Sequence, residues 1–583
     1  MVTITINGKQ IEVEEGTTIL NAASAAGMPV PSLCYLAEIN EIGACRVCVV
    51  EVKGVARLVT ACNNLVQNGM EILTNSPRVR EARRTNVELI LSQHNSSCTS
   101  CVRGGNCSLQ RIANDLGIYA SEYTKVIPKK HWPVSFPLIR DSSRCIKCMR
   151  CLQICDKVQD LHIWDIAKTG SRATVGVSHN LQITEADCAI CGQCLTHCPT
   201  GALRERDDTL KLLSAQGAFA DPEKVTIVQV APAVRAAWGE ELGLTREEAT
   251  PKRLVAALKA LGFDYVFDTD FGADLTIMEE GSEFLERLNH REDYQFPMFT
   301  SCCPGWVRFL KSQYPEMTDQ LSTAKSPHQM QGAVTKTYIA EKFGIDADQI
   351  FNISIMPCIA KKQEADIPNI NDSGHGKDVD LVLTTREIAR MIRADHLDVK
   401  NLAEEEFDDP FGTGSGAGVI FGATGGVMEA ALRSCYFLVT GNNPYPDAFY
   451  MVRGMDGWKE ACFDINGLTL HVAVVSGLGN ARKLIRAIQN GEVQYDFVEV
   501  MACPGGCVGG GGQPIHDGEE LAEVRGENLY FLDRTNDLRF SHENPKILQI
   551  YEEFLEKPLS HMAHELLHTD HHGWNMPGEE KTD

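Results

Sequence analysis

Residues 499–514 read EVMACPGGCVGGGGQP and carry two thiols, Cys503 and Cys507, in a glycine-rich turn that follows an apolar run. Two further cysteine segments lie far upstream, TSCCPGW at residues 300–306 and MPCIAKK at residues 356–362. Together they bring four or five thiols to one place without the tight spacing of a ferredoxin loop. A site built from distant segments is a pocket inside a folded domain, and a pocket supports chemistry that a cluster loop alone does not.

The sequence around these segments alternates buried strands with helices. Continuous apolar runs predict strands at residues 225–230, 265–267, 353–356, 381–383 and 471–475, and residues 251–261 follow a helical pattern. Such alternation predicts an α/β domain with parallel sheets. Function in such folds gathers at the carboxyl ends of the strands, and Cys358 and Cys503 each follow a predicted strand. We therefore expect residues 210–583 to form a large α/β domain that holds a cofactor.

The first 78 residues predict a small α+β module. Val2–Ile6 alternates like a strand, Asn7-Gly8 signals a hairpin turn, Ile11–Val13 is the return strand, and Thr17–Ala26 suits a capped helix. Four thiols follow the helix signal, and they are Cys34, Cys45, Cys48 and Cys62. They suit a [2Fe–2S] cluster on a plant-type ferredoxin scaffold, although the first gap is longer than in the plant type. A zinc site is the alternative, which the ubiquitin-like strand pattern disfavours.

A second group of four candidate ligands lies in residues 79–137. It consists of His94, Cys98, Cys101 and Cys107. One imidazole and three thiolates suit tetrahedral zinc as well as a [4Fe–4S] cluster with one histidine ligand. Spacing alone does not separate the two hypotheses. The neighbouring electron-carrying modules favour the cluster, and His94 is the weakest member of the set.

Residues 138–209 contain a duplicated cysteine pattern typical of bacterial two-cluster ferredoxins. The first run is Cys145, Cys148, Cys151 and Cys155, and the second is Cys188, Cys191, Cys194 and Cys198. In this pattern the fourth cysteine of each run binds the other cluster, so we expect Cys198 with the first run and Cys155 with the second. Residues 1–209 therefore predict an electron path of four clusters that ends at the C-terminal domain.

Composition narrows the class of protein. At 583 residues the chain should hold several domains, and its net charge of −23 argues against nucleic acid and anionic membrane surfaces as partners. No apolar run reaches the roughly 18–20 residues of a membrane span, and the N-terminus lacks a targeting signal. We expect a cytoplasmic protein, whose 22 cysteines stay reduced and bind metal. The arginine run at residues 78–84 predicts a solvated helix face, with docking of an acidic partner as the alternative.

The three cysteine segments resemble the signature motifs of the iron-only, or [FeFe], hydrogenases, and the order of the front modules resembles the multi-cluster clostridial type. The resemblance covers essentially the whole chain. It implies a [4Fe–4S] cube held by Cys303, Cys358, Cys503 and Cys507. Cys507 would also bridge to a two-iron subcluster with carbon monoxide, cyanide and dithiolate ligands, and the two parts together form the H-cluster. One [2Fe–2S] and three further [4Fe–4S] clusters would complete the cofactors.

The same resemblance implies an activity and partners. The reaction would be reversible oxidation of H2 to protons and electrons. Electrons would pass to ferredoxin, to flavin-containing NAD(P)-linked subunits, or to both, and maturation factors would load the H-cluster. Three rival hypotheses remain at this point: an iron–sulfur assembly protein, a hydrogen sensor, and a pure electron-transfer subunit. The last does not explain residues 300–512.

Adjacent thiols at positions 302 and 303 predict two different roles. Side chains of adjacent residues point in different directions, so both thiols rarely bind the same cluster. The thiol that is left free beside the metal has an ordinary pKa of about 8.5, and such a group is able to pass protons. The resemblance implies that Cys302 is the proton donor. It implies a relay formed by Cys302, Glu280, Ser322, Glu283 and Arg287. From pattern alone, the helical spacing of Glu280, Glu283 and Arg287 would equally suit a surface ion-pair stripe.

The resemblance also implies a cavity wall around the two-iron subcluster. Lys361 would pair with a cyanide ligand. The other wall residues would be Pro232, Ala233, Pro327, Met356, Phe421 and Met501. Ala233 stands where some relatives have serine, and His328 where some have glutamine, so a hydrogen bond to cyanide could differ here.

Several other patterns are interpreted as structural. The glycine-rich residues 412–426 lack the spacing of a nucleotide-binding loop, and close approach of the backbone to a bulky cofactor explains them better. Cys435 and Cys462 match no motif and are predicted to be buried structural thiols. The segment from His564 to His568 fits the H-E-x-x-H letters of zinc proteases, but without a surrounding protease domain it predicts a terminal helix.

Overall fold

The N-terminal module is a five-stranded sheet in the order β2-β1-β5-β3-β4. Its strands are β1 (Val2–Ile6), β2 (Lys9–Val13), β3 (Val49–Val52), β4 (Val59–Thr60) and β5 (Glu71–Leu73). Asn7 and Gly8 both have positive φ, 48° and 84°, which a two-residue hairpin turn requires. Helix α1 (Ile19–Ala25) is capped by Thr18 and buries Ile19 in the core of this sheet. The order of strand, turn, strand and helix is as predicted.

Helix α2 (Pro77–Leu91) carries the arginine run and corrects the prediction made for it. Arg83 is only 6% exposed and donates hydrogen bonds to the carbonyl oxygens of Val47, Val49 and Thr74. The guanidinium therefore ties the helix to the N-terminal module, because its planar fork reaches several carbonyl groups at once. The solvated-face prediction is wrong for Arg83 and right for Arg78, Arg80 and Arg84, which are exposed.

The ferredoxin-like module consists of two small two-stranded sheets and short helices. Strand β6 (Leu138–Arg140) pairs with β9 (Leu203–Glu205), and β7 (Trp164–Ala167) pairs with β8 (Thr174–Val177), both antiparallel. Helices α4 (Arg150–Lys157) and α5 (Gln193–Thr196) begin inside the two cysteine runs. The core of this module includes Ile359 and Ala360, which directly follow Cys358. The module is therefore packed onto the cysteine segment of the C-terminal domain.

The C-terminal domain is built on two four-stranded sheets. The first has the order β11-β10-β13-β14 and is entirely parallel, and the second has the order β12-β17-β16-β15. The strands are β10 (Val225–Val230), β11 (Tyr265–Asp268), β12 (Met298–Phe299), β13 (Ile350–Met356), β14 (Leu381–Thr384), β15 (Trp458–Ile465), β16 (Leu468–Ser476) and β17 (Phe497–Met501). In the second sheet, β15 runs antiparallel to β16 and the other pairs are parallel. The prediction of parallel sheets thus holds except at this edge strand.

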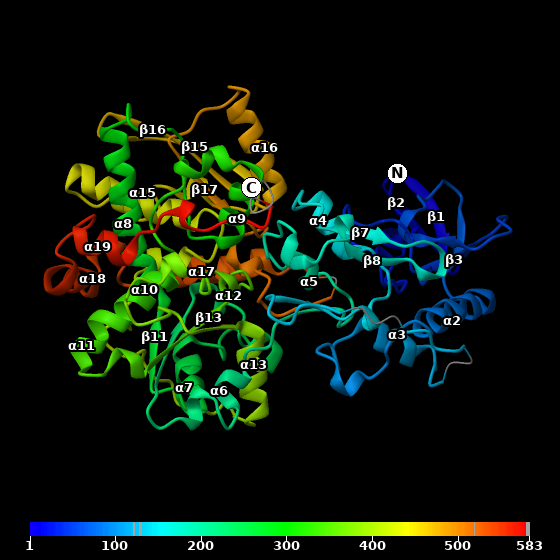
Figure 1. Cartoon of the computed structure of the whole chain (residues 1–583). Helices are drawn as coiled ribbons and strands as arrows, with labels where there is room; N and C mark the ends of the chain where they lie inside the picture. The colour runs from blue at the N-terminus through cyan, green and yellow to red at the C-terminus, as the bar shows by residue number, and fades with distance from the viewer. Residues whose placement is uncertain (121–122, 128–130, 518, 579–583) are drawn as a thin grey trace.

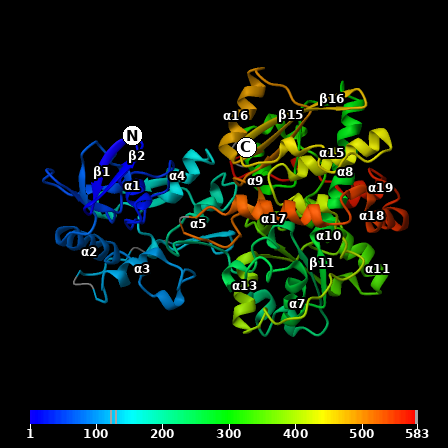
Figure 2. The same cartoon turned by 180° about the vertical axis from the view of Figure 1, so that it is seen from behind.

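Helices cover both sheets and lie between them. The α-helices of six residues or more in the described part of the domain are α7 (Pro251–Leu261), α8 (Thr269–Asn289), α9 (Pro304–Gln313), α10 (Pro327–Val334), α13 (Thr385–Ala394), α15 (Gly426–Thr440), α16 (Leu478–Gln489), α17 (Ala522–Thr535), α18 (Pro545–Ile550) and α19 (His561–Leu567). Figure 1 shows the blue and cyan front modules on one side of this domain, and Figure 2 shows α17 running between its two halves.

The computed structural model describes residues 1–120, 123–127, 131–517 and 519–578. Within these ranges, no helix combines the length and apolar character needed to cross a bilayer. Cys435 is buried as predicted, whereas Cys462 is exposed, which corrects the second prediction. Cys462 lies on β15, where alternate side chains point away from the core.

Candidate functional site

A cavity of about 80 Å³ lies where the carboxyl ends of both sheets meet. Five thiols line it, and they are Cys302, Cys303, Cys358, Cys503 and Cys507. Every predicted wall residue lines it as well: Pro232, Ala233, Pro327, Met356, Phe421, Met501 and Lys361. The fold thus brings together residues from Pro232 to Cys507, which lie on many separate segments of the sequence.

Local structure explains how each cysteine reaches this cavity. Cys303 is the residue before α9, and Pro304 starts the helix, where a missing N–H costs nothing. Cys358 follows β13 by two residues, and Cys503 follows β17 by two. Between Cys503 and Cys507 the chain turns at Gly506, whose φ is 93°, and a Cβ there would lie 2.7 Å from the backbone nitrogen of Thr424. Only glycine fits this turn.

The donor set fits an iron–sulfur cube. Burial raises the pKa of Cys303 and Cys503, and it raises the pKa of Cys358 to about 11. A metal is the ordinary means of holding such thiols as thiolates. Among the described residues, no three His, Cys, Asp or Glu side chains converge on a point that would hold one metal ion. A cluster binds its thiolates through separate irons, so its ligands surround a volume rather than a point.

Phe421 and Gly422 of the glycine-rich residues 412–426 line this cavity. An added Cβ would collide with Leu529 of α17 at Gly422, and with Asp270 of α8 at Gly414 and Gly418. At these three glycines the close approach is therefore between the loop and a helix, which corrects the cofactor explanation there.

The first half of the second ferredoxin run lies beside the same thiols. The Cys503 thiol donates to the carbonyl oxygen of Cys191 at 3.7 Å, and an added Cβ on Gly192 would lie 2.7 Å from Gly511. Arg308 of α9 donates to the carbonyl oxygen of Cys188 at 3.0 Å. The loop that carries Cys188 and Cys191 thus contacts residues of the cavity wall directly. This contact gives electrons a short route between the ferredoxin-like module and the cavity.

Four of the five residues of the predicted proton relay, Glu280, Ser322, Glu283 and Arg287, are buried, and Cys302 is half-buried. The Ser322 hydroxyl donates to Glu283 at 2.7 Å, and Arg287 forms an ion pair with Glu283 at 2.6 Å. Glu280 is 0% exposed, and neither of its carboxylate oxygens has a hydrogen-bond partner among the described residues. The surface-stripe alternative is excluded, because Glu280, Glu283 and Arg287 are all buried.

Burial and charge separate the two carboxyl groups of this row. Burial, followed by the charge of Glu283, raises the pKa of Glu280 to about 8. Burial would also raise the pKa of Glu283, but the Arg287 guanidinium, the Ser322 hydroxyl and the Thr323 N–H together outweigh burial and lower that pKa. Burial, with the Glu280 charge next, raises the pKa of Cys302 well above its ordinary value. At neutral pH, Glu280 is therefore protonated and Glu283 ionised, the arrangement that suits proton transfer.

Lys361 has a partner that the sequence did not reveal. Its Nζ lies 2.7 Å from Glu364 and donates to the carbonyl oxygen of Cys302 at 3.0 Å. Glu364 also pairs with His328 Nε2 at 2.6 Å. Burial opposes ionisation of Glu364, but Lys361 and His328 together lower its pKa to about 2. The spacing of Lys361 and Glu364, three residues apart, was the available signal.

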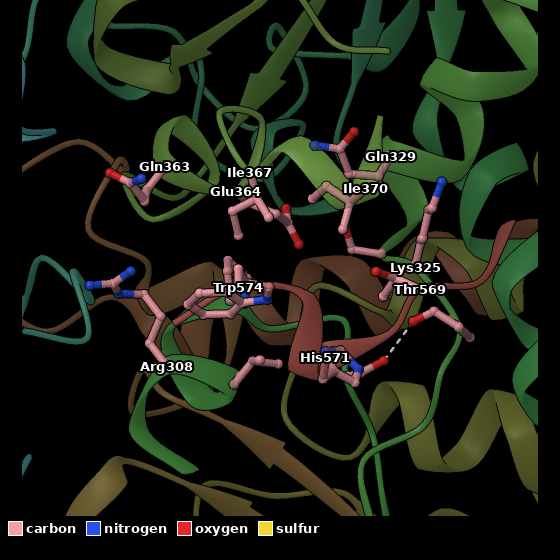
Figure 3. A pocket seen from close by; sticks show the side chains of 15 residues that line it. Arg308, Lys325, Gln329, Gln363, Glu364, Ile367, Ile370, Thr569, His571 and Trp574 are labelled. Atoms are coloured by element: carbon pink, nitrogen blue, oxygen red, sulfur yellow. Dashed lines mark hydrogen bonds between the residues drawn. The ribbon is translucent and has the colours of Figure 1, made fainter. Parts of the chain in front are cut away.

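A second, smaller cavity of about 40 Å³ (Figure 3) shares Pro304 with the lining of the first. Glu364 is on its wall, together with Lys325, Gln329, His571 and Trp574, the last two from the C-terminal segment. Both polar atoms of the Gln329 side chain are buried without a partner among the described residues. At roughly 10–15 Å³ for each water, the volume suffices for two or three water molecules that would satisfy them.

The front modules bring some of their predicted cluster ligands close to one another. Cys34, Cys45, Cys48 and Cys62 are buried, and contacts with Cys45 and Cys62 lower the pKa of Cys34. In the next module, Cys101 and Cys107 interact electrostatically, and His94 Nδ1 is buried without a partner among the described residues. Burial lowers the pKa of His94 to about 4, so its ring is neutral, as a metal ligand must be.

The C-terminal histidines do not form a protease site. Residues 561–567 form the terminal helix α19, as predicted. His568 instead bonds Glu279 and Thr323, and His571 bonds the carbonyl oxygen of Ser322.

Comparison with known protein families finds matches to five segments of the chain. The family described as iron only hydrogenase large subunit, C-terminal domain, matches residues 224–511, and iron hydrogenase small subunit matches residues 519–574. The 2Fe-2S iron-sulfur cluster binding domain matches residues 1–77. The iron–sulfur binding region of NADH-ubiquinone oxidoreductase-G matches residues 83–122, and the 4Fe-4S dicluster domain matches residues 144–202.

Individual relatives align over most of their length. The NADP-reducing hydrogenase subunit HndD of Solidesulfovibrio fructosivorans is 47% identical over 98% of both chains. Iron hydrogenase 1 of Clostridium pasteurianum is 39% identical over 97% of this chain and 99% of its own. The structure of a variant of apo [FeFe]-hydrogenase HydA1 from Chlamydomonas reinhardtii matches with a TM-score of 0.56 and 45% identity, covering 63% of this chain and all of that one.

Proposed function

Because this chain belongs to the iron-only hydrogenase family, we propose that the cysteine-lined cavity holds the H-cluster and that Cys302 begins the proton path that serves it. The protein is an oxidoreductase that interconverts H2 with protons and electrons. When bound, the H-cluster supplies the hydrogen chemistry itself. Cys303, Cys358, Cys503 and Cys507 would hold it, and the apolar wall with Met356 and Met501 would exclude water.

The observation that carries this proposal is the buried row that leads away from the cavity. Cys302 lines the cavity, and its pKa responds to the charge of the neighbouring Glu280. Glu280 would pass protons between Cys302 and Ser322, whose hydroxyl donates to Glu283. Arg287 would hold Glu283 ionised between transfers. Because neither oxygen of Glu280 has a hydrogen-bond partner among the described residues, an ordered water or a rotation of the side chain would complete each transfer to and from Glu280.

The pKa of Glu280 predicts the pH profile of hydrogen evolution. Since this pKa is raised to about 8, the carboxyl group is protonated below that pH and loses its proton above it. Hydrogen evolution limited by proton delivery should fall as pH rises through about 8. The Glu280→Gln variant should be slow at every pH and lack this alkaline limb, which steady-state rates with a saturating chemical reductant would measure.

A matched control lies on the same helix. Glu286 is exposed on α8, and Glu286→Gln should keep both the rate and the alkaline limb. If the wild-type rate of hydrogen evolution does not change from about one pH unit below the Glu280 pKa to about one pH unit above it, the role given to Glu280 is contradicted. An alkaline limb that persists in Glu280→Gln would contradict it as well.

The front modules support an electron path to a partner subunit. We propose one [2Fe–2S] cluster at Cys34, Cys45, Cys48 and Cys62, one cluster at the His94 group, and two [4Fe–4S] clusters in the ferredoxin-like module. The relative HndD is named as a subunit of an NADP-reducing hydrogenase. The partner would therefore be a flavin-containing, NAD(P)-linked subunit in a cytoplasmic complex, where thiols stay reduced.

Purification from the native host tests this partner. We expect flavin-bearing subunits to copurify with the chain, and the complex to reduce NADP⁺ with H2 while the isolated chain reduces only artificial dyes. An isolated chain that reduces ferredoxin at the full rate of the native preparation, with no copurifying flavin, would instead identify ferredoxin as the partner.

A further inference from the structure

The C-terminal segment, residues 566–574, lies antiparallel along residues 322–325, which carry the relay serine. The backbone N–H of Lys325 donates to the carbonyl of Leu567, and that of Thr569 donates to the carbonyl of Thr323, both at 2.8 Å. Ala324 and His568 form a β-bridge between these bonds. This C-terminal strap, part of the small-subunit match, therefore fixes the backbone on which Ser322 is mounted.

His568 links this loop to the helix that carries both relay carboxylates. Its Nδ1 lies 2.8 Å from the Thr323 hydroxyl, and its Nε2 lies 3.1 Å from the Glu279 carboxylate. Glu279 directly precedes Glu280 on α8. With a proton on Nε2, the imidazole donates to Glu279 and accepts from Thr323. Because His568 is only 6% exposed, water is a poor substitute for either bond.

Thr323 in turn holds the outer relay carboxylate. Its backbone N–H donates to both oxygens of Glu283 at 3.1 Å. Glu283 thus receives hydrogen bonds from Ser322, Arg287 and Thr323 together, and the serine and the threonine are adjacent in the chain. Displacement of Thr323 would move the carboxylate that accepts from Ser322, and proton transfer depends steeply on such distances.

We propose that His568 is a positioning residue for the proton relay, acting through the Thr323 hydroxyl to set the place of the Glu283 carboxylate. The inference rests on the proposed function, in which this row of residues carries protons. The C-terminal strap, which lies beyond the hydrogenase motifs in the sequence, would then help to position the relay. His571 supports the same loop separately, through its bond from Nε2 to the Ser322 carbonyl at 2.8 Å.

Asparagine and glutamine separate the two bonds of His568. An asparagine amide reaches the position of the imidazole Nδ1 and keeps the Thr323 contact, whereas a glutamine amide reaches that of Nε2 and keeps the Glu279 contact. We expect His568→Ala and His568→Gln to lower hydrogen turnover about tenfold, since Glu283 retains Arg287 and Ser322 but moves. His568→Asn should stay within about twofold of wild type, because the Thr323 hydrogen bond is kept.

Thr323 offers a second pair of variants that leaves the strap intact. Thr323→Val removes the hydroxyl and should match His568→Ala, whereas Thr323→Ser keeps it and should match wild type. The double variant Thr323→Val/His568→Ala should be no slower than either single variant, because both remove one shared interaction. Thermal unfolding of each variant, and infrared bands of the loaded cofactor, should separate lost positioning from lost folding or loading.

Cys302→Ala, measured in parallel, distinguishes the failure of this inference from that of the relay itself. If Cys302→Ala is slow while His568→Ala and Thr323→Val turn over like wild type, the relay stands and the positioning role is overturned. Activity in His568→Gln together with inactivity in His568→Asn would also overturn it, because the Glu279 anchor alone would then matter. Full turnover in Cys302→Ala would remove the relay and this inference with it.

Discussion

Replacing Cys302 with alanine is expected to lower hydrogen turnover at least about a hundredfold, the usual size of a lost general acid or base. Cys302 lines the cavity together with the four cysteines proposed to hold the cube. Its thiol is the side chain through which Glu280, buried behind it, would exchange protons with the cofactor. Alanine removes the donor and leaves those four cysteines in place. Rates of hydrogen evolution and uptake, together with iron content, provide the measurement.

Cys435 supplies a matched control for this experiment. It is a buried thiol beside α8, with its sulfur 3.9 Å from the carbonyl oxygen of Gly281, and burial raises its pKa to about 12. It does not line the cavity. Cys435→Ala should therefore retain the wild-type turnover. It measures how much the loss of a buried thiol outside the cavity lowers turnover. Equal turnover in Cys302→Ala and Cys435→Ala, both fully loaded with iron, would contradict the role given to Cys302.

Replacing Lys362 with methionine is expected to destabilise the protein by about 3–5 kcal/mol, the range for breaking a buried ion pair from one side. The Lys362 side chain is 0% exposed and lies 2.8 Å from Asp208 and 3.0 Å from Glu387. Asp208 is in the segment that leaves the ferredoxin-like module, and Glu387 caps α13 of the C-terminal domain. Methionine would leave two buried carboxylates facing each other across this junction. The midpoint of thermal unfolding provides the measurement.

The same aspartate provides an exposed control and a pH test. Lys211 also pairs with Asp208, at 3.1 Å, but its side chain is 53% exposed, so Lys211→Met should cost at most about 1 kcal/mol. Burial would raise the pKa of Asp208, but Lys362, followed by Arg206 and Lys211, outweighs burial and lowers the pKa to about 2. The stability from this pair is therefore present above the ordinary carboxyl pKa and is lost as pH falls through about 2. Equal midpoints for Lys362→Met and Lys211→Met would refute the buried-pair argument.

Local patterns predicted much of the C-terminal domain. Strand β10 and helix α7 begin and end where the apolar runs predicted, because uninterrupted apolar residues and capped helical periodicity both depend on near neighbours in the chain. The errors have a different origin. Arg83 and Cys462 were misassigned because a helix face or an edge strand becomes buried or exposed only when distant segments pack. The local sequence shows the pattern of apolar and polar residues, but which of these residues are buried depends on how distant segments pack in the tertiary structure.

The cysteine spacings by themselves predicted [2Fe–2S] and [4Fe–4S] modules ahead of a domain with a cysteine-lined pocket, and the resemblance of the three cysteine segments to a family identified that domain as a hydrogenase domain. The tandem thiols of Cys302 and Cys303 predicted that one of them stays free. Spacing suffices for the modules because a cluster loop is a local structure. Only the tertiary structure decided that Glu364 pairs with Lys361 and that His568 contacts the relay loop. Thr323 and His568 are 245 residues apart. Their hydrogen bond exists because two segments run side by side, a relation that neither local sequence contains.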